Sequence, residues 1–279
     1  MWQLTAIELF KIFKKPRTYI AFAAIAAIVF LVQMALYADG DKYLAFVLQS
    51  FEQTFQIGGL VMNGYFVCFL ILQTLLVHVP LLIALVAGDM VAGEANMGTL
   101  RLLITKPVSR TRLMLSKFIA SCVYTVLLLA FMAVLSLFGS MLIFGVGDMM
   151  ILKSEVVTIL DRNDVLWRYV AAFGFAALSM ITVAALAFLL SNFAENSIGP
   201  IIAAMSIIIV FTILTTMDIP FFNAIKPFLF TNHMLNWKGF FDRPVDRWEV
   251  LKSALVLVGH IVFFVSLALY SFRRKDILS

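Results

Sequence analysis

The chain has 279 residues, of which 63% are hydrophobic and 13% charged, and its formal net charge is +5 at pH 7. Soluble domains carry roughly 25% charged residues, so this composition excludes a soluble globular protein and indicates a polytopic membrane protein. Its basic residues flank apolar runs, which argues against nucleic acid as a partner. Cys68 and Cys122 lie inside apolar runs, so we expect them to pack as small hydrophobic side chains.

Residues 1–17 predict an amphipathic helix that lies in the membrane interface. At helical spacing, one face carries Glu8, Lys11 and Lys15. The opposite face is apolar and consists of Trp2, Ala6, Leu9, Phe10 and Phe13. A mitochondrial presequence is a weaker alternative, because such segments are poor in acidic residues and rich in serine.

Six apolar segments follow, and each is long enough for a membrane-spanning helix of about 20 residues. We expect an all-α protein with one transmembrane domain over residues 1–279 and spans at 18–38, 65–88, 113–144, 168–190, 198–217 and 250–271. Pro80 should kink span two. His78 in the same span is either a functional group or, more often in such a position, a hydrogen-bonding residue that faces the bundle.

Three segments connect the spans on the side that we expect to be outside. Residues 39–64 repeat Leu44, Val47 and Leu48, then Phe51 and Phe55, at helical spacing and form either a surface helix or a plain loop. Residues 145–167 form an acidic segment. Residues 218–250 are rich in aromatic residues and interrupted by prolines, which predicts short helices dipping into the outer leaflet or an aromatic belt.

The distribution of charges predicts the orientation. The N-terminus, residues 89–117, the turn at 191–197 and the C-terminus together hold 12 Lys or Arg and 5 Asp or Glu. The opposite side holds 9 Lys or Arg and 11 Asp or Glu. Because cytoplasmic loops carry the excess of Lys and Arg, we expect both termini in the cytoplasm.

Residues 93–112, the connector between spans two and three, form the only substantial cytoplasmic loop in this arrangement. Met97, Leu100 and Ile104 would share one face of a short helix, Pro107 would end that helix, and Ser109 could cap the next one. Such a helix suits docking to a soluble partner, although an ordinary basic loop would have a similar composition.

Motifs for chemistry are absent from the sequence. It contains no G-x-x-x-x-G-K-[ST], no H-E-x-x-H and no G-x-S-x-G. Ser140 and His260 could meet as in an intramembrane serine protease, but their flanks do not support it. The methionines are scattered, which favours core packing over a copper site. Carboxylates at mid-membrane are nearly absent, so transport would require an external energy source.

The chain resembles the permease subunits of the ABC-2 family of ATP-binding cassette transporters, in the subgroup similar to nitrous-oxide-reductase maturation and gliding-motility permeases. The resemblance covers essentially the whole chain. Its specific part is an acidic residue, G-T-L, a Leu-rich turn and P-x-S-R before span three, carried here by Glu94, Gly98-Thr99-Leu100, Leu103, Pro107-Val108-Ser109-Arg110 and Lys117. The chain departs from the family at Ala95-Asn96, where a second charged residue is common.

This resemblance implies a pair of permeases, identical or paralogous, above two separately encoded ATPase subunits that hold ATP and Mg. The chain itself would bind no cofactor and no metal. Residues 94–106 would be the coupling helix, with apolar contacts from Met97, Leu100 and Ile104. The residues expected at or beside the ATPase contact are Glu94, Met97, Gly98, Thr99, Leu100, Arg101, Leu103, Ile104, Lys106, Pro107 and Arg110.

The resemblance also implies a substrate pathway lined by spans one, two and five. The pathway and gate candidates are Gln33, Gln73, Thr74, His78, Thr212, Thr215, Pro220 and Pro227, with Gly139 as a further hinge candidate. These faces are apolar with scattered polar groups, which suits an amphiphile or a hydrophobic peptide. A packed dimer interface would have the same composition.

The expectation is therefore a multi-pass permease of the bacterial inner membrane that exports or extracts a substrate with energy from a partner ATPase. One alternative is an anchoring or mechanotransmission subunit that signals to a periplasmic partner through residues 39–64 and 145–167. A remote alternative is an intramembrane enzyme.

Overall fold

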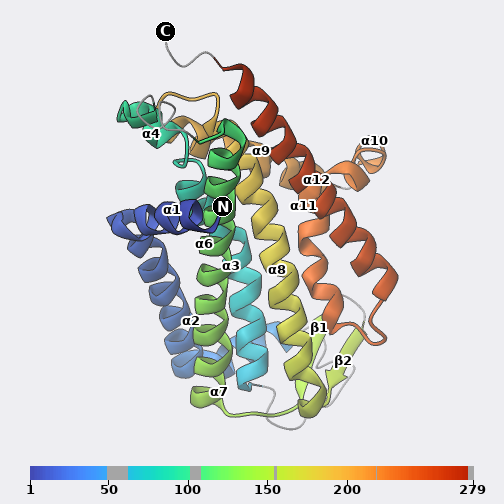
Figure 1. Ribbon diagram of the computed structural model, residues 1–279. Coiled ribbons are helices and arrows are strands. Elements are labelled where there is room, and N and C mark those ends of the chain that lie inside the picture. Colours follow the sequence, from blue (N-terminus) through green and yellow to red (C-terminus); the bar gives the residue numbers. More distant parts are fainter. Residues whose placement is uncertain (49–61, 101–107, 154–155, 218, 276–279) are drawn as a thin grey trace.

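The computed structural model describes residues 1–48, 62–100, 108–153, 156–217 and 219–275. Within these ranges, six helices are long and apolar enough to cross a membrane: Pro16–Gly40, Gly64–Ala87, Arg110–Phe144, Arg162–Ser191, Ile198–Thr216 and Arg247–Arg274. Each coincides with one of the expected spans. Met1 and the last turn of the final helix, which ends at Arg274, lie toward the same end of the bundle, which we call the terminal end (Figure 1).

Helix α1 (Trp2–Lys14) lies across the terminal end, at a steep angle to α2 (Pro16–Leu48), which descends from it (Figure 1). On the apolar side of α1, Trp2 and Phe10 are 79% and 67% exposed, whereas Leu9 and Phe13 pack against the core. On the polar side, Glu8 is buried. The polar side of this amphipathic helix therefore faces the protein. Helix α2 continues past a break at Asp39 to Leu48, so residues 40–48 are helical, which is one of the two alternatives for this segment. Phe51 and Phe55 lie outside the described residues.

Helix α3 (Gly64–Ala87) begins at Asn63, whose side chain accepts hydrogen bonds from the Tyr65 and Phe66 N–H groups, and it runs through Pro80. The third span consists of α6 (Arg110–Ala133), the π-helical segment η1 (Val134–Phe138) and α7 (Gly139–Phe144). Ser109 caps α6 by accepting a hydrogen bond from the Arg112 N–H, which confirms the predicted cap.

The segment between α7 and α8 adds a small β-hairpin to this otherwise helical protein. It forms a hairpin of β1 (Met149–Lys153) and β2 (Val156–Leu160), paired antiparallel with Met149 opposite Leu160. These stretches are rich in β-branched and long aliphatic residues, which suit a pleated surface. Met149 and Leu160 are fully buried, and the Asn63 amide donates to the Asp148 carbonyl at 2.6 Å, which ties the hairpin to α3.

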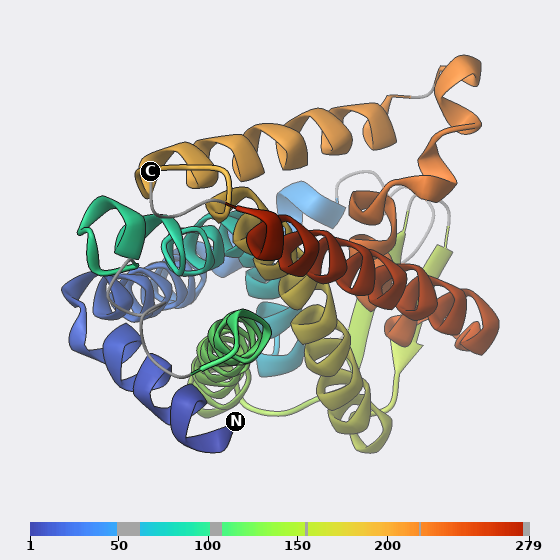
Figure 2. The same ribbon diagram turned by 45° about the horizontal axis from the view of Figure 1, so that its top comes forward.

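Helix α8 (Arg162–Ser191) is the most buried of the spans and contacts α3, α6, α9 and α12. A short turn leads from it to α9 (Ile198–Thr216). The expected short helices follow as α10 (Pro220–Asn223), η2 (Lys226–Phe228), α11 (Phe230–Met234) and η3 (Leu235–Phe241). Phe230, Trp237 and Phe241 are buried, so α11 and η3 pack inside the protein. Helix α12 (Arg247–Arg274) completes the bundle and crosses it diagonally in Figure 2.

Candidate functional site

The terminal end of the bundle brings together segments that are far apart in sequence. Helix α1, the end of α3, the short helix α4 (Ala92–Asn96) and the start of α6 meet there (Figures 1 and 2). The end of α12 joins them, because Arg110 donates to the Arg273 and Lys275 carbonyls at 3.2 and 2.9 Å. The Lys275 ammonium in turn donates to the Asn192 carbonyl at 2.7 Å, in the turn between α8 and α9.

A network of buried charges occupies this junction. We call it the ionic cluster, and it consists of Glu8, Lys11, Lys15, Arg17, Asp89, Glu94 and Lys117. Lys117 of α6 is 1% exposed and lies 2.8 Å from a Glu8 oxygen and 2.7 Å from a Glu94 oxygen. Lys11 bridges the same two carboxylates, at 2.8 Å from each. Each of these two lysines thus connects α1 to α4 through both glutamates.

The second half of the ionic cluster is centred on Asp89, which follows α3 and is 5% exposed. Its carboxylate pairs with Lys15 at 2.6 Å and with Arg17, and it accepts a hydrogen bond from the Ser197 hydroxyl. Ser197 precedes α9, so this one carboxylate joins the N-terminal segment to the turn between α8 and α9. The Ser191 hydroxyl adds a further contact by accepting hydrogen bonds from the Val91 and Ala92 N–H groups.

The pairing shifts the pKa values of the groups that lie outside the spans. Burial alone would raise the pKa of Glu8, but the nearby Lys117 and Lys11 outweigh burial and lower it. For Lys11, burial would lower the pKa, but hydrogen bonds to Glu8 and Glu94 raise it. Burial, reinforced by the neighbouring Arg17, lowers the pKa of Lys15 to about 8. The cluster holds four cations and three carboxylates, so it retains excess positive charge.

The connector differs in detail from the single helix that the spacing suggested. Helix α4 ends at Asn96 with Met97 as its C-cap, and Gly98 follows with a φ of +69°, a left-handed conformation that ends helices and favours glycine. Met97 therefore comes before this turn and Leu100 after it, so the two residues do not belong to one continuous helix. Arg101, Leu103, Ile104, Lys106 and Pro107 lie outside the described residues.

The expected partner-contact residues fall into two groups. Met97 is 58% exposed, and Asn96 and Gly98 are also exposed at the tip of the connector. Glu94 and Leu100 are buried at 6% and 3% exposure, so they hold the connector against the rest of the chain instead of facing outward. Thr99 is partly buried, and its hydroxyl donates to the Glu94 carbonyl at 3.3 Å.

Some of the pathway candidates lie together on the flank of the bundle. Gln73, Thr74 and His78 lie on an exposed face of α3, and Thr212 is exposed on α9. Gln73 and Thr212 line one groove of about 440 Å³. Gln73 and Thr74 line another of about 290 Å³ against α2. His78 hydrogen-bonds the Thr74 carbonyl of its own helix at 2.9 Å and does not face the bundle interior as expected.

The remaining candidates are placed elsewhere. Gln33 is 5% exposed and donates to the Leu135 carbonyl and the Ser140 hydroxyl at 3.1 and 3.0 Å. It therefore bridges α2 to the π-helical segment and is not available to a pathway. The Thr215 hydroxyl donates to the Thr212 carbonyl within α9. Pro220 is the first residue of α10, and Pro227 is the second residue of η2.

Sequence reasoning found the parts of the ionic cluster but not the cluster itself. The signals were present as Asp89 and Lys117 at the ends of apolar runs and as the charged face of residues 1–17. Pairing across 109 positions between Glu8 and Lys117 has no local signature, so only the fold reveals it. Ser140 and His260 are bonded to Gln33 and to the Val256 carbonyl, respectively. No metal-binding group of three His, Cys, Asp or Glu occurs among the described residues.

Comparisons with known proteins complete the description. Residues 18–278 match the family model described as "Protein of unknown function (DUF2705)". The chain is also similar to the uncharacterized protein YhcI of Bacillus subtilis (strain 168), with 25% identity over 199 residues. That match covers 69% of this chain and 63% of YhcI, which is less than two thirds of the relative's length.

Proposed function

The chain belongs to the DUF2705 family, and on that premise we propose that it is the permease subunit of an ATP-binding cassette transporter. Two ATPase subunits encoded by another gene would bind ATP and Mg and dock at the terminal end. A second permease, identical or paralogous, would complete the membrane domain. The assembly would export or extract an amphiphilic or hydrophobic substrate across the bacterial cytoplasmic membrane, with both termini in the cytoplasm.

The observation that carries this proposal is the way the connector is held. Its tip at Met97 is exposed, whereas Glu94 and Leu100 beside it are buried. Glu94 is paired to α1 through Lys11 and to α6 through Lys117, and the preceding Asp89 is paired to Lys15. A force applied at the exposed tip would therefore move several spans together. Such an arrangement suits a contact through which a soluble motor acts.

The exposed face shared by α2, α3 and α9 supports the second half of the proposal. Leu31 of α2, Val77 of α3 and Ile209 of α9 are 64%, 65% and 53% exposed, and the polar Gln73 and Thr212 lie among such side chains. Contact with a second permease would cover these groups. A pathway at that contact would be apolar with sparse hydrogen-bonding groups, which is why we assign it an amphiphilic or hydrophobic substrate.

Met97→Asp tests the coupling contact directly. We expect the full chain, expressed with its genomic neighbours, to co-purify with a soluble ATPase. Placing a charge at an apolar contact of this kind should weaken that association by at least about tenfold. Ile159→Asp is the matched control, because Ile159 is 55% exposed on the hairpin at the opposite end. Leu100→Asp is less informative, because Leu100 packs within the chain.

Equal recovery of the ATPase by Met97→Asp and by Ile159→Asp would contradict docking at the connector. Recovery of no ATPase by the unaltered chain would contradict the transporter proposal itself. Anchoring or mechanotransmission would share the ATPase but require a partner on the opposite side. We therefore expect candidate lipids, lipoproteins or peptides to stimulate ATP hydrolysis if the subunit transports, and only a periplasmic protein partner to do so if it anchors.

A further inference from the structure

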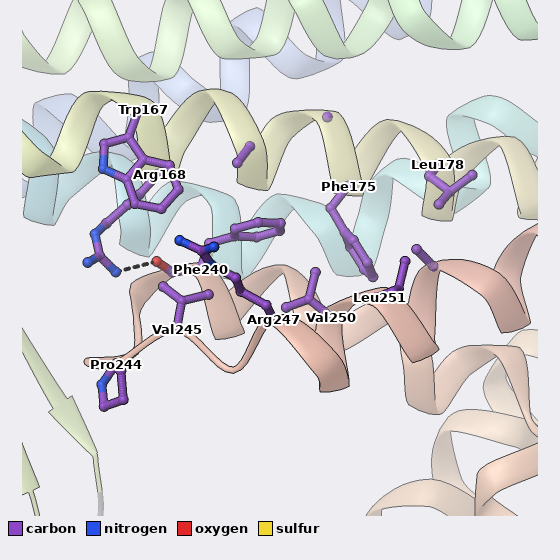
Figure 3. Close-up of a pocket in the computed structure, with 13 residues that line it drawn as sticks. Trp167, Arg168, Phe175, Leu178, Phe240, Pro244, Val245, Arg247, Val250 and Leu251 are labelled. Carbon is purple, nitrogen blue, oxygen red and sulfur yellow. Dashed lines mark hydrogen bonds between the residues drawn. The ribbon is translucent and has the colours of Figure 1, made fainter.

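A further groove, remote from the connector, lies between α8, η3 and α12 near the hairpin end of the bundle (Figure 3). It has a volume of about 830 Å³, and its walls are mostly apolar. Phe175 and Leu178 of α8 face Val250 and Leu251 of α12 across it, and Phe240 of η3 forms part of its wall. The groove opens on the flank of the spans, since Trp167 and Leu251 are 48% and 50% exposed.

The length of the groove matches one leaflet of a bilayer. Its lining on α8 extends from Trp167 to Leu178, and Arg168 is near its outer limit. Ten residues of helix from Arg168 to Leu178 rise about 15 Å. The hydrocarbon core of a membrane is about 30 Å thick. The groove therefore runs from the level of the lipid headgroups to about the middle of the membrane, which is the depth that one acyl chain occupies.

Arg168 and Arg247 lie at the headgroup end of the groove, and they differ in whether their guanidinium groups are already bound within the chain. Arg168 donates to the Phe240 and Asp242 carbonyls at 2.7 and 2.9 Å and pairs with Asp164, so its role is internal. Arg247 is exposed and makes no hydrogen bond or ion pair within the part of the chain that the structure describes. Figure 3 shows its guanidinium group at the same end of the groove as that of Arg168.

Asp164 and Asp246, two of the carboxylates on these elements, are already engaged within the chain. Asp164 accepts hydrogen bonds from Arg168 and from the Trp167 indole, and Asp246 accepts from the Trp248 and Glu249 N–H groups. Arg247 is also the first residue of α12, where the helix dipole disfavours a cation. An anion from outside the chain is the partner that this guanidinium lacks.

The surrounding residues fit the interface of a membrane. Trp167 and Trp248 are 48% and 71% exposed at the level of the two arginines. Tryptophan is enriched at membrane–water interfaces, because its ring is apolar and its N–H is polar. The groove thus combines an interface at one end with an apolar slot of one-leaflet length below it.

We propose that this groove binds one anionic phospholipid, with an acyl chain along α8 and α12 and its phosphate group on Arg247. Guanidinium groups bind phosphate oxygens through charge-assisted, often bidentate hydrogen bonds. The site requires only that the spans cross a membrane, so it is independent of the proposed ATPase coupling. A failure of either proposal leaves the other standing.

Native mass spectrometry of the full chain in detergent tests the site. Phosphatidylglycerol and phosphatidylcholine with identical acyl chains would be titrated separately, and we expect one tightly retained phosphatidylglycerol. Arg247→Gln should reduce the preference for phosphatidylglycerol by about tenfold, as for the loss of one charge-assisted hydrogen bond. Arg247 is exposed, so this variant should fold like the unaltered chain.

Filling the groove gives a second, independent test. A side chain on Gly174, which lines the groove, would enter open space, since a Cβ there has no neighbour within 4 Å. Gly174→Phe should abolish retention of both lipids. The matched control is Gly259→Phe on α12. A Cβ at Gly259 also has no neighbour within 4 Å, but Gly259 does not line the groove. The proposal would be overturned if Arg247→Gln kept the full preference for phosphatidylglycerol, or if the two phenylalanine variants retained lipid equally. It would also be overturned if the groove retained a peptide that phosphatidylglycerol does not displace.

Discussion

At the scale of single residues, the ionic cluster is the least expected feature of the chain. Burying charges costs several kcal/mol per ion, and their attraction only offsets that cost when the geometry is good. The cluster is therefore better explained by specificity than by stability. The Lys117 ammonium can lie 2.8 Å from a Glu8 oxygen and 2.7 Å from a Glu94 oxygen only when α1, α4 and α6 are in one relative position. We infer that the cluster fixes that position.

Glu8→Gln should reveal the cluster through its pH dependence. The pairing lowers the pKa of Glu8 in the folded protein, so its contribution to stability is present above the unfolded carboxyl pKa of about 4.3. It is lost as pH falls through the lower folded value. At pH 7, removing one partner of a buried pair should cost about 3 kcal/mol, with Lys11 contributing less because 36% of its side chain is exposed.

The measurement is the difference in melting temperature between Glu8→Gln and the unaltered chain in detergent, followed from pH 7 to pH 3. We expect a lower melting temperature for the variant at pH 7 and a difference that disappears as Glu8 becomes protonated. Glu195→Gln, at an exposed position in the turn between α8 and α9, is the matched control. A difference that does not change with pH would mean that Glu8 acts through packing alone.

At the scale of elements, α3 and α7 approach each other closely at Gly64. Gly64 donates its N–H to the Gly145 carbonyl at 2.9 Å, and a Cβ on Gly64 would lie 2.5 Å from the Met141 Cα. Backbone atoms cannot move aside as a flexible side chain can. The hairpin end of α3 therefore depends on glycine at this position.

Gly64→Ala should destabilise the protein by roughly 1–3 kcal/mol, the usual cost of overpacking. Gly174→Ala provides a control of the same chemistry, because its Cβ meets no neighbour and alanine favours a helix by about 1 kcal/mol. Thermal unfolding of the two variants in one detergent separates the effects. A Gly64→Ala protein as stable as Gly174→Ala would show that α3 and α7 do not approach this closely.

The elements also show where local patterns were sufficient and where they were not. Long apolar runs located all six spans, because burial in lipid demands a length that the sequence displays directly. By composition, residues 145–167 form an acidic segment that contains Asp148, Glu155, Asp161 and Asp164, and this composition does not reveal the strands. The alternative signal was Val156-Val-Thr-Ile-Leu160, a β-favouring run that predicts half of a hairpin.

At the scale of the whole molecule, the sequence predicted the composition of the ends of the bundle but not their assembly. The excess of Lys and Arg at the terminal end was visible, whereas the structure shows that Lys11, Lys15, Arg17 and Lys117 are paired with carboxylates. Gln33 is a similar case, because its interhelical partners lie more than 100 positions away. Hydrophobic periodicity describes the faces of one helix at a time, so it does not predict which residues of different helices are in contact.

Orientation is a property of the whole molecule, and it decides which end can meet a cytoplasmic motor. Met97→Cys at the tip of the connector and Ile159→Cys on the hairpin are matched probes, at 58% and 55% exposure. Cys68 and Cys122 are both within spans, and Cys68 is fully buried, so their background should be low. Both variants would be exposed to a membrane-impermeant maleimide in intact cells and again after permeabilisation.

We expect the Ile159→Cys variant to react while the cytoplasmic membrane is intact, provided that the reagent can pass the layers outside that membrane. We expect the Met97→Cys variant to react only after the cytoplasmic membrane is permeabilised. The physical reason is the retention of Lys- and Arg-rich loops on the cytoplasmic side. Labelling of Met97→Cys from outside would place the connector and both termini away from any source of ATP. The ionic cluster would then fix the arrangement of an extracellular junction, and the proposed coupling to an ATPase would fail.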